Sequence, residues 1–481
     1  MHKINSDTIQ VLSQIQQKYS KLGVKVFYPQ GADCLKGFNS DRDVGRALSL
    51  LKLSGNAVFI SEPDSRGKDL VNCVLLSLSR DTPGISAVCL DVGALIAADN
   101  KEAAFNFQGI IQCLQEAEGK IVLFFTALGR AVENDSIISV LSKVLKQKSI
   151  PILSVVSMDE FRKLEEVPGV SGLLQFILTE KKDVSGKRDK SVLIMGASSL
   201  FGNSIYRLFS REYMAVCGTG FSKASSFGFD KLDVTCEEEI KTYFMKHPGF
   251  DIVIYVAGEA NADIAEKERK KAHALNVDAI SAIGRYAKGC KFVYISSEYV
   301  FDGSSGPYGS GSAANPINYY GCTKLEGESI SLKNFPDSLV IRLGALYGYN
   351  GPSDKETTVS KLIAALDKPE PLKADNVQIK HPLLLEDAAR TLLKLLDYKV
   401  SGIYQTNGPE GLSKQEMAEK IAAIRNKMTG QAFSYPIIGI EQPGVAAKPL
   451  NTHMVNVDTP RPFDEGIRFL LAIDRNKKYE N

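Results

Sequence analysis

The sequence lacks the features that mark membrane, secreted and nucleic-acid-binding proteins. No stretch of its 481 residues approaches the roughly 18 uncharged apolar residues of a membrane span. The polar start, Met1–Gln10, does not have the charged-then-apolar order of a signal peptide. The formal net charge is only +2, so the chain as a whole has no strong positive electrostatic field that would attract a polyanion such as nucleic acid. We therefore expect a soluble, cytoplasmic protein that binds neither membranes nor nucleic acid.

Metal sites and disulfides are also disfavoured. The eight cysteines are scattered without any C-x-x-C pair, and only five histidines are present as partners. This pattern is typical of reduced core thiols. We expect no metal site.

The chain is too long for one small module, because domains usually hold roughly 100 to 200 residues. The clearest shift in composition is Thr179–Ser191, a basic segment with almost nothing apolar. We interpret it as an interdomain linker, with a solvated loop inside one domain as the alternative. The predicted domains are residues 1–183 and 191–481, joined by residues 184–190.

Short apolar, β-branched runs alternate with helix-period stretches in both halves. In the first half these runs are Ala57–Ile60, Ala87–Val92, Ile121–Phe125 and Pro151–Val156. In the second half they begin at Ser191, Met214, Phe250, Lys291 and Leu339. The rhythm predicts an α/β protein with two α/β units, the second a Rossmann-type doubly wound parallel sheet. A smaller substrate lobe is expected from about residue 350, where Pro and Gly become denser.

A candidate phosphate-binding turn follows the strand that begins at Ser191. It comprises Gly196, Ser198, Ser199, Leu200, Phe201 and Gly202, and a helix pattern follows it. In a dinucleotide site the first Gly makes the tight turn and the last allows close packing of the helix. Ser199 stands where the middle Gly is usual, so an ordinary β–α turn remains the alternative.

The end of the second strand bears on cofactor choice. No carboxylate lies between Glu212 and Asp230, whereas an NAD site usually has one there. Ser222 and Lys223 instead offer a hydroxyl and a cation suited to a 2′-phosphate. The sequence thus favours NADP(H) over NAD(H), with two solvated side chains as the alternative.

Three residues form a candidate catalytic set. Ser297 ends a predicted buried strand, and Tyr320 and Lys324 are four residues apart, on one helix face. A tyrosine ordinarily has a pKa near 10, and a neighbouring ammonium would bring that pKa closer to neutrality. Ser297 would hold a substrate oxygen while Tyr320 exchanges its proton. A Y-x-x-x-K pair alone also arises by chance.

Several ordered motifs resemble the dTDP-4-dehydrorhamnose reductase group of extended short-chain dehydrogenases/reductases. They are LDVT at Leu232–Thr235, AEKE at Ala265–Glu268, NVDA at Asn276–Ala279, SSEYVFDG at Ser296–Gly303, YGCTKLEGE at Tyr320–Glu328, GIYQTNGPEG from Gly402 and AKPLNTHMV at Ala447–Val455. The resemblance runs from Lys190 to the C-terminus.

The resemblance implies catalytic roles for Ser297, Tyr320 and Lys324, and an adenine contact for Asp233. It also implies cofactor contacts from Val256, Ala257, Gly258, Tyr320 and Lys324. Three departures bear on substrate identity: Ser199 replaces Gly, Glu298 replaces the signature Asp, and Val256–Asn261 differs from the family run.

The first half resembles the first ATPase module of Clp-type unfoldases from about Asp41 to Glu180. A working phosphate loop needs correctly spaced glycines, a lysine and a hydroxyl. Ser61 leads here, one residue too many precedes Gly67-Lys68, and Asp69 replaces the hydroxyl.

The catalytic acid pair of such ATPases is also missing, since Thr126-Ala127 stands in its place. Without the metal groups and the base, ATP hydrolysis has no route. We expect a degenerate, inactive module that serves as a scaffold or docks a protein partner.

Two functions remain open. One is an NADPH-dependent reductase of a keto group on a nucleotide sugar. The other is a non-catalytic, NADP-binding regulatory protein, because GFSKASS at Gly220–Ser226 is also similar to the beta regulatory subunits of methionine adenosyltransferase. A homodimer is left open in both cases.

Overall fold

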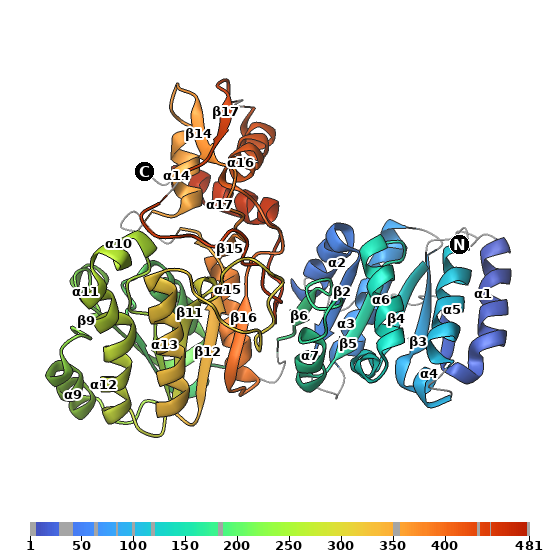
Figure 1. Cartoon of the computed structure of the whole chain (residues 1–481), viewed down its shortest axis with the longest axis horizontal. Coiled ribbons are helices and arrows are strands. Elements are labelled where there is room, and N and C mark those ends of the chain that lie inside the picture. Colours follow the sequence, from blue (N-terminus) through green and yellow to red (C-terminus); the bar gives the residue numbers. More distant parts are fainter. Residues whose placement is uncertain are drawn as a thin grey trace. The chain divides into compact units, whose positions relative to one another are not determined.

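The protein consists of two compact units (Figure 1). The computed structural model describes residues 6–27, 42–61, 66–82, 85–98, 102–116, 121–180, 186–349, 356–430, 433–442 and 444–478. Unit 1 contains Met1–Glu180 and Val455–Thr459, and unit 2 contains Lys181–Met454 and Pro460–Asn481. Within the predicted linker, residues 184 and 185 lie outside the described residues, and strand β7 already begins at Arg188. The predicted domain boundaries stay a prediction.

Unit 1 is built on a six-stranded sheet in the order β1-β3-β4-β5-β2-β6. Its strands are β1 Val24–Phe27, β2 Asn56–Ile60, β3 Ser86–Asp91, β4 Ile121–Thr126, β5 Ile152–Val156 and β6 Phe176–Leu178. β1 pairs antiparallel with β3, and the other pairs are parallel. Parallel pairing requires crossovers, which the intervening helices supply.

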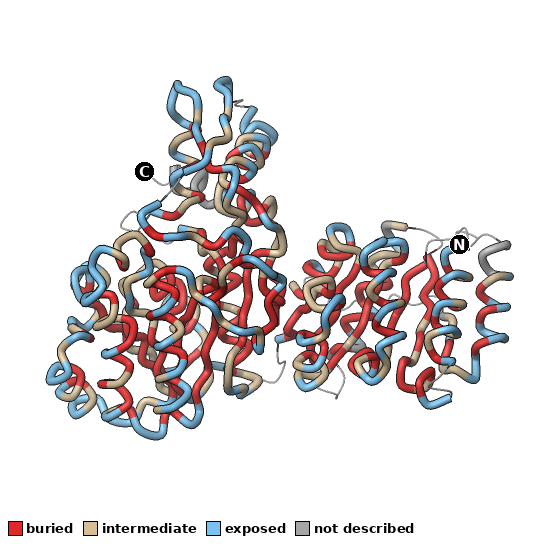
Figure 2. The backbone as a smooth tube through the Cα atoms, in the orientation of Figure 1, coloured by how far each residue is buried: buried red, intermediate tan, exposed pale blue. Residues whose placement is uncertain are grey.

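The helices of unit 1 separate its strands along the chain, apart from the first helix, which precedes β1. They are α1 Ser6–Tyr19, α2 Arg42–Ser54, α3 Arg66–Asp81, α4 Val92–Ala98, α5 Ala103–Glu116, α6 Asp135–Gln147 and α7 Met158–Glu165. Every residue of β2 is buried, and Figure 2 shows the central strands as a continuous buried layer. The unbroken apolar run Ala57–Ile60 is thus explained by a strand covered on both faces.

Unit 2 contains a seven-stranded sheet in the order β16-β12-β11-β10-β7-β8-β9, all of whose pairs are parallel. The strands are β7 Arg188–Met195, β8 Tyr213–Gly220, β9 Asp230–Lys231, β10 Ile252–Tyr255, β11 Lys291–Ser297, β12 Ser338–Leu343 and β16 Gly402–Thr406. The order reverses between β7 and β10, where α/β sheets bind ligands beyond their carboxyl ends. The predicted fold class is confirmed.

Helices separate these strands along the chain. They are α8 Leu200–Glu212, α9 Glu237–Lys246, α10 Ala262–Lys267, α11 Arg269–His273, α12 Ala279–Tyr286, α13 Tyr319–Asn334 and α15 Leu385–Asp397. α11 and α12 are joined by a π-helical turn, Ala274–Asp278, which forms one continuous helical segment with them.

A second layer of structure follows β12. Its elements are α14 Thr358–Ala365, α16 Lys414–Thr429 and α17 Phe463–Lys478, the parallel pair β14 Leu372–Asp375 and β17 Ile437–Ile440, and the short pair β13 Leu346–Tyr347 and β15 Leu383–Leu384. These elements share their own hydrophobic core, which includes Leu362, Met417, Ile421 and Ile467. Strand β16 pairs with β12 in the main sheet, so the chain after residue 350 contributes to both the main sheet and this lobe.

Candidate functional site

The turn after β7 fits a dinucleotide. Gly196 has φ 95°, and a Cβ there would lie 2.5 Å from the Ala257 nitrogen. A Cβ on Gly202 would lie 2.2 Å from the Gly196 oxygen. Only glycine is tolerated at both positions. The loop after β10 is fixed against this turn, since the Val256 and Ala257 N–H groups both donate to the Met195 oxygen.

Ser199 caps helix α8. Its hydroxyl accepts a hydrogen bond from the Gly202 N–H at 3.1 Å. This role explains why serine stands where a glycine is usual, because an N-cap needs a side-chain acceptor. The cap occupies one of the N–H groups that a helix N-terminus otherwise offers to a phosphate.

The end of β8 carries the predicted 2′-phosphate residues on its surface. Ser222 and Lys223 are both exposed. Lys231 on β9 is a further cation that sequence reasoning missed, and its Nζ lies 5.5 Å from the Phe221 ring centroid. The parallel pairing of Gly220 with Lys231 brings it there, and no local sequence pattern signals that pairing.

Asp233, the predicted adenine contact, lies just beyond β9. Its Oδ1 accepts hydrogen bonds from the Thr235 N–H at 2.9 Å and the Thr235 hydroxyl at 2.6 Å. The neighbouring Leu232 N–H donates to the Gly220 oxygen, which ties this turn to the end of β8.

The catalytic candidates come together at the carboxyl end of β11. Ser297 ends the strand, and its hydroxyl hydrogen-bonds Tyr320 in the first turn of α13. Ser297, Tyr320 and Lys324 are all buried. The Lys324 ammonium lies 4.6 Å from the ring centroid of Tyr294. A Cβ on Gly258 would lie 4.0 Å from that ammonium, so the loop after β10 reaches the same place.

Burial governs the ionisation of this set. It raises the pKa of Tyr320 to about 12, although the Ser297 hydrogen bond opposes the shift. It lowers the pKa of Lys324 to about 7. The expectation that Lys324 depresses the pKa of Tyr320 is therefore not met, because desolvation disfavours both charged forms.

Asn276 is a site residue that sequence reasoning did not single out. It lies in the π-helical turn, is fully buried, and its Nδ2 donates to the Thr323 hydroxyl at 2.9 Å. Its Oδ1 accepts from the Glu259 N–H at 3.0 Å, so it joins α13 to the loop after β10. The motif NVDA contains this residue, but nothing local shows what it contacts.

Glu298, which departs from the family signature, is almost wholly buried beside Ser297. Burial raises the pKa of its carboxyl to about 7, although Lys380 and a hydrogen bond from Thr452 oppose the shift. The next residue, Tyr299, packs edge-on against Tyr320 with ring centroids 5.8 Å apart. The Lys380 ammonium lies 3.4 Å from the Tyr299 hydroxyl.

Lysines gather on the small-lobe side of this site. The positive charges of Lys380, Lys448 and Lys361 all lower the pKa of Lys414, which burial lowers most. Lys414 is the first residue of α16 and its Nζ contacts Gln442 at 3.3 Å. Such a cluster favours an anionic ligand.

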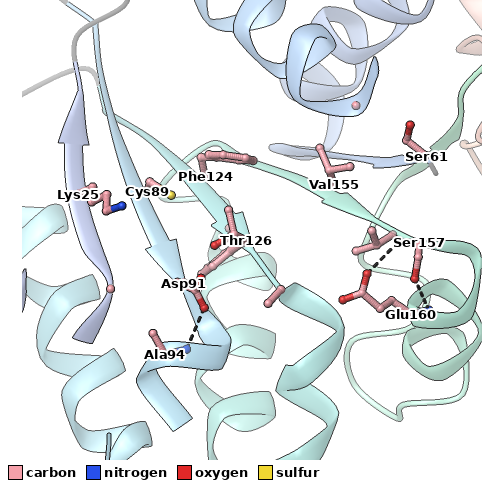
Figure 3. A pocket seen from close by; sticks show the side chains of 15 residues that line it. Lys25, Ser61, Cys89, Asp91, Ala94, Phe124, Thr126, Val155, Ser157 and Glu160 are labelled. Carbon is pink, nitrogen blue, oxygen red and sulfur yellow. Dashed lines mark hydrogen bonds between the residues drawn. The ribbon is translucent and has the colours of Figure 1, made fainter. Parts of the chain in front are cut away.

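Unit 1 has a cavity of about 650 Å³ at the carboxyl ends of its parallel strands (Figure 3). Ser61, Gly67, Thr126 and Ala127, which the sequence places at the degenerate ATPase site, all line it. Asp69 is exposed on α3, and the side chain of Lys68 lies outside the described residues.

Carboxylates also face this cavity. Asp91 Oδ1 accepts from the Ala94 N–H at 2.8 Å. Glu160 Oε2 accepts from the Ser157 N–H at 2.8 Å, and the Ser157 hydroxyl accepts in return from the Glu160 N–H (Figure 3). Across the described parts of both units, no cluster of three or more metal-ligating side chains is found. No helix among the described residues is long and apolar enough to cross a membrane.

Residues 190–468 match the RmlD substrate binding domain family, which covers more than half of the 481 residues. The chain belongs to this family. Among RmlD-type structures, it resembles the dTDP-4-dehydrorhamnose reductase of Clostridium acetobutylicum, with a TM-score of 0.52 at 24% identity over 59% of this chain and 99% of that one. It also resembles the dTDP-4-dehydrorhamnose reductase of Bacillus anthracis, solved in complex with NADP. The TM-score is 0.52 at 24% sequence identity, and the match covers 60% of this chain and 100% of that one. At this identity the likeness shows the fold alone.

Sequence relatives point in two directions. Methionine adenosyltransferase 2 subunit beta of Danio rerio is 31% identical over 49% of this chain and 74% of that protein. The same subunit of Xenopus tropicalis is 30% identical over 61% of this chain and 89% of that protein. A probable low-salt glycan biosynthesis reductase of Haloferax volcanii is 30% identical over 48% and 79%. The sequence relatives therefore include both beta subunits of methionine adenosyltransferase 2 and a probable reductase.

Proposed function

We propose that unit 2 binds NADP(H) and reduces a keto group on a nucleotide sugar. The observation that carries this proposal is the hydrogen bond between Ser297 and Tyr320, with Lys324 one turn further along α13. This is the arrangement needed to hold a carbonyl oxygen and to deliver a proton to it.

The residues around Gly196 fit a nicotinamide dinucleotide. Gly196 and Gly202 allow the turn after β7, the loop after β10 and the start of α8 to pack closely, which places the N-terminus of α8 where a pyrophosphate would bind. We assign the phosphate turn to Ser198, Ser199, Leu200 and Phe201 as well, and the nicotinamide side to Val256, Ala257, Gly258, Tyr320 and Lys324. Bound NADPH would supply the hydride.

The protein's own groups supply the rest of the reaction. Ser297 orients the carbonyl oxygen, and Tyr320 donates the proton that converts this oxygen into a hydroxyl. With a pKa of about 12, Tyr320 is protonated at neutral pH and is ready to act as the acid. Solvent would then reprotonate the tyrosinate that remains, and Lys324, one turn further along α13, is assigned to the cofactor.

A nucleotide sugar is favoured by charge. Lys361, Lys380 and Lys448 act electrostatically on Lys414, and Lys380 reaches Tyr299 beside the catalytic set. Carboxylates offset part of this charge, since Lys361 pairs with Glu356 and Lys448 with Asp263. A diphosphate bound near these lysines would leave the sugar at Tyr320. The names of the reductase relatives agree with such a substrate.

The experiment is a reductase assay with purified protein, NADPH and a panel of nucleotide keto-sugars, followed by the absorbance of reduced nicotinamide. We expect oxidation that depends on the sugar and is lost in Tyr320→Phe. NADPH binding without oxidation for any sugar in the panel would contradict the reductase proposal.

A regulatory function is the second candidate, and the similarity to methionine adenosyltransferase 2 subunit beta favours it. On that proposal unit 2 binds NADP(H) but acts by association with a catalytic subunit. Co-purification with a methionine adenosyltransferase, together with an effect on its kinetics, would support this alternative. The absence of both in a protein that turns over a keto-sugar would exclude it.

For unit 1 we propose a degenerate Clp-type ATPase module that serves as a scaffold. The cavity supports this, since Ser61, Gly67, Thr126 and Ala127, which stand where a phosphate loop and an acid pair would be, all line it. The carboxylates of Asp91 and Glu160 at the cavity would repel nucleotide phosphates. We expect no ATP hydrolysis above background, and magnesium-dependent turnover that disappears in Lys68→Ala would contradict the proposal.

A further inference from the structure

A buried ion pair of unit 2 has no part in the reaction steps proposed above. The Arg342 guanidinium of β12 donates to both carboxylate oxygens of Glu328 on α13, at 2.9 Å from Nε to Oε1 and 2.7 Å from Nη2 to Oε2. The two side chains are only 3% and 2% exposed. A contact of this kind, with two parallel hydrogen bonds, fixes the orientation of the carboxylate.

The same carboxylate is tied to the strand that ends at Ser297. The Ser296 hydroxyl donates to Glu328 Oε1 at 2.5 Å. Ser296 and Ser297 are the last two residues of β11, and both are buried. Glu328 therefore lies on α13 and accepts hydrogen bonds from the neighbouring strands β11 and β12, next to the candidate site.

Glu328 also lies one helical turn from Lys324. The two residues are four apart on α13 and both are buried, and side chains at this spacing are neighbours on one helix face. Both meet β11, since the Lys324 ammonium lies 4.6 Å from the Tyr294 ring centroid and Glu328 accepts from Ser296. Burial lowers the pKa of Lys324, and the negative charge of Glu328 opposes this shift. Charges interact more strongly in such an interior than in water.

The other ionisable groups around Lys324 do not replace this carboxylate. Burial raises the pKa of Tyr294 well above its ordinary value near 10, so its hydroxyl is uncharged at neutral pH. Burial is also the main cause of the raised pKa of Tyr320, and the charges of Glu298, after β11, and Glu259, in the loop after β10, add to it. Among the described residues, the α13 carboxylate is the charged group that acts on Lys324.

We propose that Glu328 is a positioning residue of the candidate site: its carboxylate, oriented by Arg342 and Ser296, keeps the amine of Lys324 in its charged form. Burial lowers the pKa of Lys324 to about 7 even with Glu328 in place, so at neutral pH the charge of this lysine depends on the carboxylate. A charged Lys324 donates hydrogen bonds to oxygen atoms of a ligand. This consequence rests on the proposed function, in which Lys324 contacts NADP(H).

An NMR titration of Lys324 tests this role without substrate or turnover. The protein carries isotopically labelled lysine, and the Lys324 signal is identified by its loss in Lys324→Met. In Glu328→Gln, which keeps the size of the side chain, the pKa of Lys324 should fall by about one pH unit or more, because a neighbouring opposite charge is removed. A merely loosened structure would admit water and raise this pKa toward its ordinary value. An unchanged or raised pKa in folded Glu328→Gln would overturn the proposal.

The matched control is Glu326→Gln, which removes a carboxylate from an exposed position of the same helix. It should leave the titration of Lys324 unchanged. If Glu328→Gln does not fold, because the buried charge of Arg342 is left unpaired, a double variant with Glu328→Gln and Arg342→Met removes both charges. The pKa of Lys324 should fall in this double variant too, and a value equal to that of the parent would contradict the role of Glu328.

Calorimetry with NADPH separates this role from the proposed function. In the parent, NADPH affinity should fall as the pH rises through about 7, where Lys324 loses its proton. In Glu328→Gln the same fall should come at a lower pH, by the difference that NMR gives for the free protein. A shifted Lys324 titration in a protein that does not bind NADPH would support the role of Glu328 and refute the cofactor assignment. The same pH dependence of NADPH affinity in parent and variant would overturn the proposal.

Discussion

The Ser199 hydroxyl accepts a hydrogen bond from the Gly202 N–H at 3.1 Å, at the start of the helix that follows the phosphate turn. Ser199→Gly should tighten NADPH binding, because it frees this N–H for a phosphate. Ser199→Ala should cost about 1 kcal/mol of stability, the usual effect of losing an N-cap acceptor. Calorimetry and thermal unfolding measure the two effects.

Asn134→Ala is the control for the Ser199 variants, since Asn134 caps α6 of unit 1 through the Ile137 N–H. It should reduce stability without changing NADPH affinity. Weaker NADPH binding in Ser199→Gly would show that the serine itself contacts the cofactor.

Replacement of Tyr320 by Phe deletes the proposed proton donor and retains the packing of the ring. Turnover should fall by roughly 10² to 10⁴, the usual contribution of a positioned acid, while NADPH affinity stays the same. Cys322 lies between Tyr320 and Lys324 on α13 but is exposed, so Cys322→Ala should leave turnover unchanged. Equal turnover in Tyr320→Phe and the parent would rule out the mechanism.

The charge of Glu298 makes stability depend on pH. Its pKa is raised from 4.5 to about 7 in the folded protein, so the folded state binds more protons than the unfolded state between these values. The contribution of this carboxyl is therefore present at low pH and is lost as the pH rises through about 7.

The substitution Glu298→Gln should consequently raise the free energy of unfolding above that of the parent protein at pH 8, and by much less at pH 5. At 1.36 kcal/mol per pKa unit, the gain is on the order of 3 kcal/mol. Urea unfolding at both pH values measures it. Glu238→Gln, at an exposed position of α9, should show no such difference. A gain that is the same at both pH values would mean that Glu298 is not the titrating group.

Cofactor choice should depend on Lys223. Removal of this ammonium in Lys223→Ala should narrow the preference for NADP(H) over NAD(H) by roughly ten- to a hundredfold, the range for a charge-assisted contact. Lys246→Ala, in the last turn of α9, is the matched control. Calorimetry with both cofactors decides, and equal affinities in the unmutated protein would refute the preference.

The sequence by itself determined the fold class of unit 2 and predicted that Ser297, Tyr320 and Lys324 belong to one candidate site. Its strand runs are apolar because both faces of the sheet are covered, and local patterns therefore reveal them. Gly202 could be recognised because its steric requirement is set by the nearby Gly196 and Ser199, whereas the atoms that exclude a side chain at Gly196 belong to the distant Ala257. Tyr320 and Lys324 share a helix face through local periodicity alone.

Only the tertiary structure decided which distant residues meet. The pairing of β8 with β9 places Lys231 near Phe221, and the π-helical turn carries Asn276 to Thr323. Burial reversed the expected pKa shift of Tyr320, since desolvation depends on packing that no local spacing encodes. The contact between Arg46 and Asp458 joins positions 412 residues apart, and long-range contacts of this kind are fixed by topology and not by local sequence.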